Sequence, residues 1–286
     1  MVELPGRGTT FVRELAGPPG APTLMLLHGW VATADINWFP SFEGLARRFR
    51  VVALDHRGHG RGLRSSRPFR LRDCAEDAVA LADTLGIEHF IPVGYSMGGT
   101  IAQLMWHEHP DRVDGLVLCA TAGRFSATRD ERFLFAAVGA LARAFRVTPA
   151  PVRRRLSSLY LGRRGRRYDE WAGEQIAHHD WTKILDAGHE IGRFSSQAWA
   201  AEIDVPTAVL LTMRDRVVPL RRQIQLFESI PTAHAYRLDG DHDVCVVGAH
   251  RFVPTLIAAC RDVAERAQLG SSRRAVIGSD VSGAAT

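Results

Sequence analysis

Residues 90–110 read FIPVGYSMGGTIAQLMWHEHP and join an apolar run, a group of glycines and an amphipathic stretch. The apolar run predicts a β-strand, and the stretch after Ser96 predicts a helix that ends before Pro110. Ser96 lies between Gly94 and Gly98 in a G-x-S-x-G pattern. At such a strand-to-helix turn the serine backbone is strained, and the flanking glycines let strand and helix approach closely. The pattern indicates a nucleophilic serine, although three fixed positions recur by chance in roughly one chain in ten of this length.

Four further apolar runs have the length of β-strands and do not alternate with polar residues. They are TLMLLHG (23–29), VVALD (51–55), VDGLVLCA (113–120) and TAVLLTM (207–213). Strands that are apolar on both faces are typical of a parallel sheet covered by helices on each side. Because amphipathic stretches such as residues 71–85 alternate with these runs, we expect an α/β fold with an open, mostly parallel sheet. Such sheets bind ligands at the carboxyl ends of their strands, so a site is expected in the loops that follow them.

The alternation stops between residues 122 and 203, where the sequence is helix-like and rich in arginine. We expect residues 122–203 to form a helical cap over the carboxyl end of the sheet. Residues 1–121 and 204–269 would then form the core. Residues 270–286 (GSSRRAVIGSDVSGAAT) are small and polar, which predicts a disordered tail.

The composition of the 286 residues is typical of a globular protein, with 46% hydrophobic and 23% charged residues. The net charge of +5 is uneven, because residues 124–200 hold 14 Lys and Arg against 8 Asp and Glu. A basic excess confined to one segment does not indicate a nucleic-acid-binding protein. The four cysteines lack the paired short spacings of a disulfide framework or a zinc site. No signal peptide or membrane span is apparent, so we expect a cytoplasmic protein without membrane insertion.

A serine hydroxyl needs a general base to become a strong nucleophile. Among the twelve histidines, His242 follows a strand-like run (233–238) and lies in the short loop DGDHD (239–243) before an apolar helix. This order and loop context make His242 the expected base. His178 and His179 stand beside an aspartate in the arginine-rich segment, where we expect a solvated pair rather than a metal site.

The acid that orients the base is expected before His242, just after a strand. Asp215 meets both conditions, since it lies in RDRVVP (214–219) directly after an apolar run. No carboxylate follows the run that ends at Ala120, which removes the other common placement of this acid. The chain order is therefore Ser96, Asp215, His242.

A serine nucleophile also needs two N–H donors, an oxyanion hole, for the charged oxygen of the tetrahedral intermediate. The backbone N–H of Met97, the first residue after Ser96, is one expected donor. The other is expected from HGW (28–30), which follows an early strand and whose glycine allows close approach of the backbone. Trp30 N–H is the expected second donor.

These motifs together resemble the α/β-hydrolase superfamily, and most of all its capped esterases, lipases and C–C hydrolases. The resemblance runs from residue 9 to about 266 outside the arginine-rich segment, through HGW (28–30), DHRGHGRG (55–62), GYSMGG (94–99), RDRVVP (214–219) and GDHD (240–243). It implies a mostly parallel eight-stranded sheet with a helical cap inserted after the sixth strand. It also implies that Ser96, Asp215 and His242 form a catalytic triad and that the N–H groups of Trp30 and Met97 form the oxyanion hole. We expect no metal and no cofactor.

Two positions depart from the pattern of this superfamily. Glycine usually stands three residues before the acid, where this chain has Thr212, and a small residue usually precedes the histidine, where this chain has Asp241. Neither change removes a reacting group. The serine nucleophile argues against haloalkane dehalogenase and epoxide hydrolase chemistry, which needs a carboxylate at that position.

The leading hypothesis is a serine hydrolase that cleaves a small carboxylic ester through an acyl-enzyme at Ser96. A second hypothesis is C–C bond hydrolysis, or a lyase step, on an anionic metabolite with the same triad, because arginine clusters bind carboxylates and phosphates. A hypothesis of another class is a ligand-binding receptor that keeps the fold with little turnover.

Overall fold

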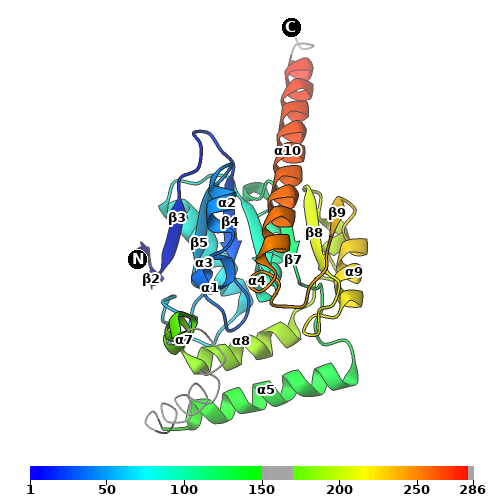
Figure 1. Cartoon of the computed structure of the whole chain (residues 1–286). Helices are drawn as coiled ribbons and strands as arrows, with labels where there is room; N and C mark the ends of the chain where they lie inside the picture. The colour runs from blue at the N-terminus through cyan, green and yellow to red at the C-terminus, as the bar shows by residue number, and fades with distance from the viewer. Residues whose placement is uncertain (150–151, 153–169, 283–286) are drawn as a thin grey trace.

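The computed structural model describes residues 1–149, 152 and 170–282 of the chain. Its centre is a seven-stranded sheet in the order β3-β5-β4-β6-β7-β8-β9 (Figure 1). The strands are β3 (Val12–Leu15), β4 (Thr23–Leu27), β5 (Arg50–Leu54), β6 (Ile91–Tyr95), β7 (Leu116–Cys119), β8 (Thr207–Thr212) and β9 (Ala233–Leu238). Of these strands, β3 pairs antiparallel with β5 and the others pair in parallel. The predicted α/β fold with a mostly parallel sheet is confirmed.

The main sheet has seven strands where eight were expected. The first two strands, β1 (Val2–Leu4) and β2 (Gly8–Thr10), pair only with each other among the described residues and form a separate antiparallel hairpin. A tight turn closes this hairpin, with Arg7 N–H donating to the carbonyl of Leu4 at 2.9 Å. Neither strand therefore adds to the edge of the main sheet.

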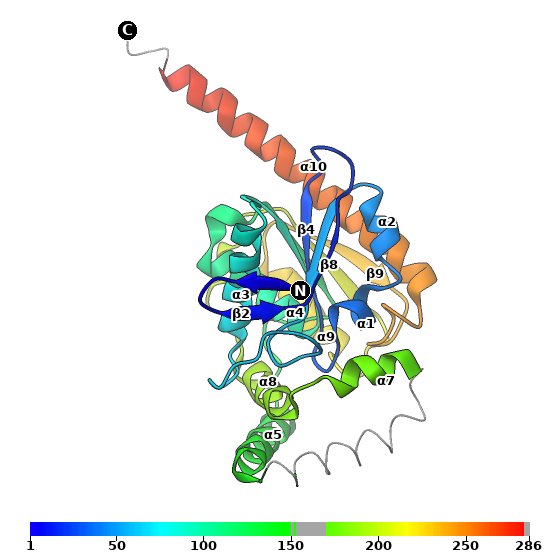
Figure 2. The ribbon, with the colours of Figure 1, turned by 90° about the vertical axis from the view of Figure 1, so that its left-hand side faces the viewer.

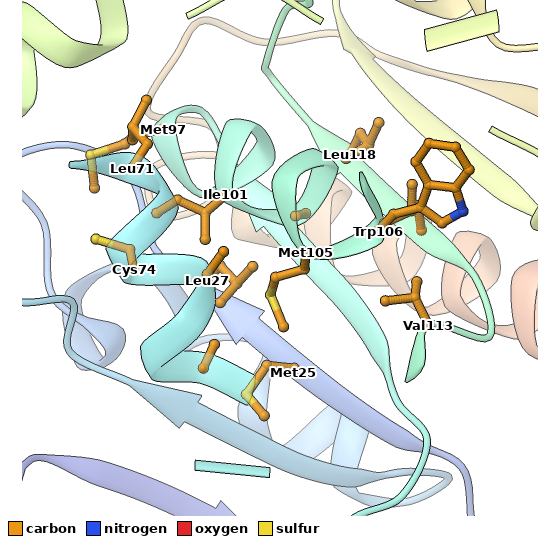
Figure 3. Packing of buried hydrophobic residues seen from close by; sticks show 14 of the residues in the cluster. Met25, Leu27, Leu71, Cys74, Met97, Ile101, Met105, Trp106, Val113 and Leu118 are labelled. Atoms are coloured by element: carbon orange, nitrogen blue, oxygen red, sulfur yellow. The ribbon is translucent and has the colours of Figure 1, made fainter. Parts of the chain in front are cut away.

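Helices cover both faces of the sheet, so its central strands are buried on both sides. Helices α1 (Ala34–Trp38), α2 (Phe42–Ala46) and α10 (Ala249–Ser282) lie on one face, and α3 (Leu71–Thr84), α4 (Met97–Glu108) and α9 (Leu220–Ser229) lie on the other. Strand β4 is buried on both sides. Met25 and Leu27 pack in the hydrophobic cluster under α3 and α4 (Figure 3), and Leu24 and Leu26 pack in the cluster under α1, α2 and α10. Continuous apolar runs are what such strands require.

In its described residues, the chain between β7 and β8 forms three α-helices, here called the insertion, and one short 3₁₀ turn. They are α5 (Arg129–Val147), α7 (Glu170–Ala177), α8 (Trp181–Arg193) and η3 (Ala200–Glu202). In Figures 1 and 2 the three α-helices lie together at one end of the sheet. The backbone N–H of Asp180, at the start of α8, donates to the carbonyl of Gly58 at 2.8 Å, which joins the insertion to the loop after β5.

The insertion follows β7, which is the fifth strand of the main sheet along the chain rather than the expected sixth. The division into a core (1–121 and 204–269) and a cap (122–203) stays a prediction. Seven of the arginines that make this segment basic, all between residues 153 and 167, lie outside the described residues.

Helix α10 extends beyond the end expected from the sequence. It continues to Ser282, whereas the sequence predicts a disordered tail from residue 270, and residues 283–286 lie outside the described part of the chain. Extending an existing helix adds one hydrogen bond for each residue fixed, so a weak sequence can continue a helix that it would not start. Among the described residues no helix, α10 included, combines the length and apolar character that crossing a bilayer requires.

Candidate active site

Ser96 occupies the turn between β6 and α4, with backbone angles φ 53° and ψ −114°. A positive φ is uncommon for a residue with a Cβ atom and persists only where neighbours hold it. The Ser96 N–H donates to the carbonyl of Cys119 at 2.9 Å, and the Thr121 hydroxyl donates to the carbonyl of Ser96 at 2.7 Å. Both partners belong to β7 or the loop after it, so the neighbouring strand holds the turn in place.

The two glycines of the G-x-S-x-G pattern are required by the close contact of β6, α4 and β4. A Cβ atom on Gly94 would overlap the backbone of Gly98, and one on Gly98 would overlap the carbonyl of Leu27. The first turn of α4 therefore lies directly against β4. This contact places the start of α4, with its free N–H groups, beside Ser96.

A continuous hydrogen-bond chain joins Ser96, His242 and Asp215. Ser96 Oγ lies 3.0 Å from His242 Nε2, and His242 Nδ1 lies 2.8 Å from Asp215 Oδ2. Because the carboxylate only accepts, Nδ1 carries the proton and Nε2 is left to accept from the serine hydroxyl. The Asp215 side chain is fully buried, that of His242 is 21% exposed and Ser96 is 8% exposed, so the hydrogen-bond chain starts at a fully buried acid. The three residues singled out in the sequence come together here.

The carboxylate of Asp215 is held by donors on both oxygens. Its Oδ1 accepts the backbone N–H groups of Val217 at 2.9 Å and Val218 at 2.8 Å. Its Oδ2 accepts the Thr212 hydroxyl at 2.7 Å and, more weakly, Gln223 Nε2 at 3.4 Å. Neither side chain was predicted to be a partner of the acid. Thr212 was visible as a departure from the usual glycine, whereas nothing in the pattern of α9 marks Gln223.

The loop that carries His242 is fixed at its backbone. The hydroxyl of Tyr95, the residue before the serine, donates to the carbonyl of His242 at 2.7 Å. Asp241 Oδ1 accepts the backbone N–H groups of His242 at 2.8 Å and Arg216 at 3.0 Å, and these two bonds lower the pKa of Asp241. Asp241 thus ties the loop after β9 to the loop after β8.

The HGW segment lies against the serine turn. A Cβ atom on Gly29 would lie 3.5 Å from Ser96 Cβ, and the Gly29 N–H donates to Asn37 Oδ1 at 2.9 Å. In the described part of the chain, neither Trp30 nor Met97 uses its backbone N–H in a hydrogen bond. Free N–H groups on both sides of a serine hydroxyl can stabilise an oxyanion formed there.

Four buried histidines pack behind this segment. His28 and His56 lie with ring centroids 4.3 Å apart, His59 lies 5.3 Å from His28, and His179 lies 5.6 Å from His59. Burial lowers the pKa of His28 to about 3 and that of His179 to about 4. The expectation that His179 is solvated is wrong, because its Nδ1 accepts the backbone N–H of Gly60 at 2.7 Å across the interface with the insertion. Local sequence gives no signal for such a contact.

The DHRGHGRG motif has a structural explanation. Asp55 Oδ1 accepts the N–H of Ala34 at 2.8 Å and Oδ2 accepts the N–H of Arg61 at 2.9 Å, which ties the loop after β5 to α1. Burial raises the pKa of Asp55 to about 6. Arg57 forms a two-bond ion pair with Asp77 of α3, with both distances 2.7 Å. The motif therefore anchors the loop on which the insertion rests.

Comparison with known proteins agrees with this architecture. The family model described as alpha/beta hydrolase fold matches residues 22–248. The chain is 32% identical over 228 residues to a pimeloyl-[acyl-carrier protein] methyl ester esterase of Chromobacterium violaceum, covering 75% of this chain and 84% of that protein. It is 27% identical over 247 residues to a putative carbamate hydrolase, RutD, of Agrobacterium fabrum, covering 83% and 92% of the two chains.

A solved structure shares the fold over nearly its whole length. The enol-lactonase of Burkholderia xenovorans LB400 superposes with a TM-score of 0.71 at 24% identity, covering 90% of this chain and 98% of that one. The matched family model spans the strands from β4 to β9, the serine turn and both loops that hold Asp215 and His242. On this evidence the chain is a hydrolase that belongs to the alpha/beta hydrolase fold family.

Proposed function

We propose that the protein is a serine hydrolase of small carboxylic esters, with Ser96 as nucleophile, His242 as general base and Asp215 as the group that orients the imidazole. The observation that supports this most is the unbroken chain of hydrogen bonds, 3.0 Å and 2.8 Å long, from Ser96 Oγ through His242 to Asp215. Such a chain supplies the base and the orienting carboxylate that a serine hydroxyl lacks by itself.

The proposed reaction has two halves. His242 Nε2 takes the hydroxyl proton as Ser96 Oγ attacks the ester carbonyl, and the buried carboxylate of Asp215 stabilises the imidazolium that forms. The backbone N–H groups of Trp30 and Met97 stabilise the oxyanion of the tetrahedral intermediate. His242 then protonates the leaving alcohol, which leaves an acyl-enzyme on Ser96. Water, activated by His242, attacks the acyl-enzyme and releases the acid.

The test is steady-state hydrolysis of a p-nitrophenyl ester series by wild type and by Ser96→Ala. We expect Ser96→Ala to lower kcat by at least about 10⁴-fold, with an unchanged unfolding midpoint. Ser195→Ala is a matched control, because this serine is exposed in the chain segment after α8, and it should keep the wild-type rate. Wild-type turnover by Ser96→Ala would disprove the assignment.

The same experiment separates the two other hypotheses. An anionic diketone added to the panel reports C–C bond hydrolysis, for which Ser96→Ala should also be inactive. A fluorophosphonate probe that labels Ser96 without measurable turnover of any substrate would instead indicate a receptor. Arg146, one of the arginines that motivate the C–C hypothesis, pairs with Asp186 at 2.7 Å within the insertion itself.

A further inference from the structure

The side chain of Trp30 contacts the insertion. Its indole Nε1–H donates to the carbonyl of Ile184 in α8 at 2.8 Å. A Cβ atom on Gly188, one turn further along α8, would lie 2.6 Å from Cζ2 of the indole and 3.0 Å from Cγ1 of Val138 in α5. The ring therefore lies directly on the backbone of α8, in a space that exists because residue 188 has no side chain.

The backbone around Trp30 has few other supports. Gly29 is held by Asn37, and the turn that follows is closed by a long bond of 3.3 Å from Ala32 N–H to the carbonyl of Gly29. Val31 has φ 59°, a conformation that is strained for a β-branched residue and that persists only where the surroundings impose it. The backbone of Val31 also forms a hydrogen bond with His179, and the contact of the Trp30 indole with α8 is a second support from the insertion.

Helices α5 and α8 offer a firm surface for this contact. A Cβ atom on Gly139 of α5 would lie 2.5 Å from Nδ1 of His189 in α8, and one on Gly192 of α8 would overlap the ring of Phe135 in α5. Two helices that approach through glycines have little freedom to shift separately. The indole of Trp30 thus rests on a joined pair of helices.

We propose that Trp30 is a positioning residue whose side chain, held by α8, sets the direction of its own backbone N–H in the oxyanion hole. The indole and the N–H belong to one residue, so a displacement of the ring on α8 turns the peptide that points at the substrate oxygen. The packing of the insertion thereby controls the stabilisation of the transition state. This inference rests on the proposed function of Ser96 and its oxyanion hole.

The test is the substitution Gly188→Ala, which places a methyl group against the indole without touching Ser96, His242 or Asp215. Gly173→Ala is the matched control, since Gly173 lies within α7 of the same insertion and a Cβ atom there meets nothing within 4 Å. Both changes raise helix propensity equally, by about 1 kcal/mol. A third variant, Trp30→Phe, removes the Nε1–H donor and leaves an aromatic ring.

We expect Gly188→Ala to lower kcat for p-nitrophenyl butyrate by about 10- to 100-fold, because a donor misplaced by about 1 Å loses most of its effect. KM should change by less than about threefold, since the oxyanion forms only after binding. A trifluoromethyl ketone, which forms an oxyanion adduct with the serine, should bind more weakly by the factor lost in kcat/KM. A non-reacting amide inhibitor should keep its affinity, and Gly173→Ala should match wild type throughout.

The inference is wrong if folded Gly188→Ala keeps the wild-type kcat and ketone affinity. It is also wrong if kcat falls while ketone affinity does not, because that result indicates a merely structural effect. If Gly188→Ala does not fold, Trp30→Phe is the deciding variant. We expect it to lose roughly tenfold in kcat and in ketone affinity. Wild-type values of both would contradict the inference. Failure of the proposed function is distinguishable, since it appears as turnover by Ser96→Ala.

Discussion

Replacing Thr212 by valine removes one hydrogen bond to the acid and keeps the shape of the side chain. The Thr212 hydroxyl is buried at the end of β8 and donates to Asp215 Oδ2 at 2.7 Å, the oxygen that also accepts from His242. It also accepts Gln223 Nε2 at 2.7 Å. Valine offers neither bond, so the carboxylate loses a donor in a place that water does not reach.

The expected loss follows from the charge and burial of the acceptor. A hydrogen bond to a charged group contributes about 1.5–3 kcal/mol, against about 0.5–1.5 kcal/mol for a neutral pair. Gln223 Nε2 keeps its bond to the carbonyl of Val218 at 2.8 Å, so the substitution removes only part of the hydrogen bonding of the Gln223 amide. We expect Thr212→Val to lower the free energy of unfolding by about 2–3 kcal/mol. We expect kcat to fall roughly tenfold, because the bonds from two backbone N–H groups still hold Asp215.

Urea unfolding and ester kinetics measure the two effects. Thr207→Val is the matched control, since Thr207 starts the same strand, is fully buried and donates to a neutral acceptor, the carbonyl of Val205, at 3.0 Å. Thr212→Ser keeps the hydroxyl and should restore kcat. The reasoning is refuted if Thr212→Val is no less stable than Thr207→Val and retains the wild-type kcat.

Two further predictions concern stability. Gly98→Ala places a methyl group on the carbonyl of Leu27 and should cost about 3 kcal/mol or more of unfolding free energy. Urea unfolding beside Gly173→Ala measures this, and equal stability of the two variants would contradict it. The pKa of His28, about 3, and of His179, about 4, lie below the value of about 6.5 in the unfolded chain. Between these pKa values the unfolded chain takes up protons that the folded chain does not. The contribution of the two neutral histidines to the free energy of unfolding is therefore complete above pH ~6.5. It falls between pH ~6 and ~4 by about 1.4 kcal/mol per pH unit for each histidine. Denaturant midpoints at pH 7.5 and 5.0 test this, with equal midpoints as the contrary result.

The parallel sheet and the serine turn could be predicted because both have local requirements. A strand covered on both faces must be apolar at every position, as residues 24–27 are, and that pattern is visible without any partner. The close contact of β6 with α4 needs glycines at 94 and 98, two residues on each side of the serine. Asp215 and His242 were found from their order and from their place after strands, although His242 is 146 residues from Ser96.

The supports of the site depend on contacts between distant segments and were not predicted. Thr212 and Gln223 reach the carboxylate of Asp215 because α9 packs beside β8. The hydrophobic pattern of neither segment predicts this packing.

The sequence by itself thus determined the class of fold, the strained turn at Ser96 and the candidates Asp215 and His242 in the loops after strands. Strand patterns and turn sterics act over a few neighbouring positions, so they are visible without the tertiary structure. Only the tertiary structure decided that His179 meets Gly60 across 119 residues and that Trp30 meets Ile184 across 154. A side chain chooses its hydrogen-bond partner from the groups that packing brings within about 3 Å, and that choice exists only once the segments have come together.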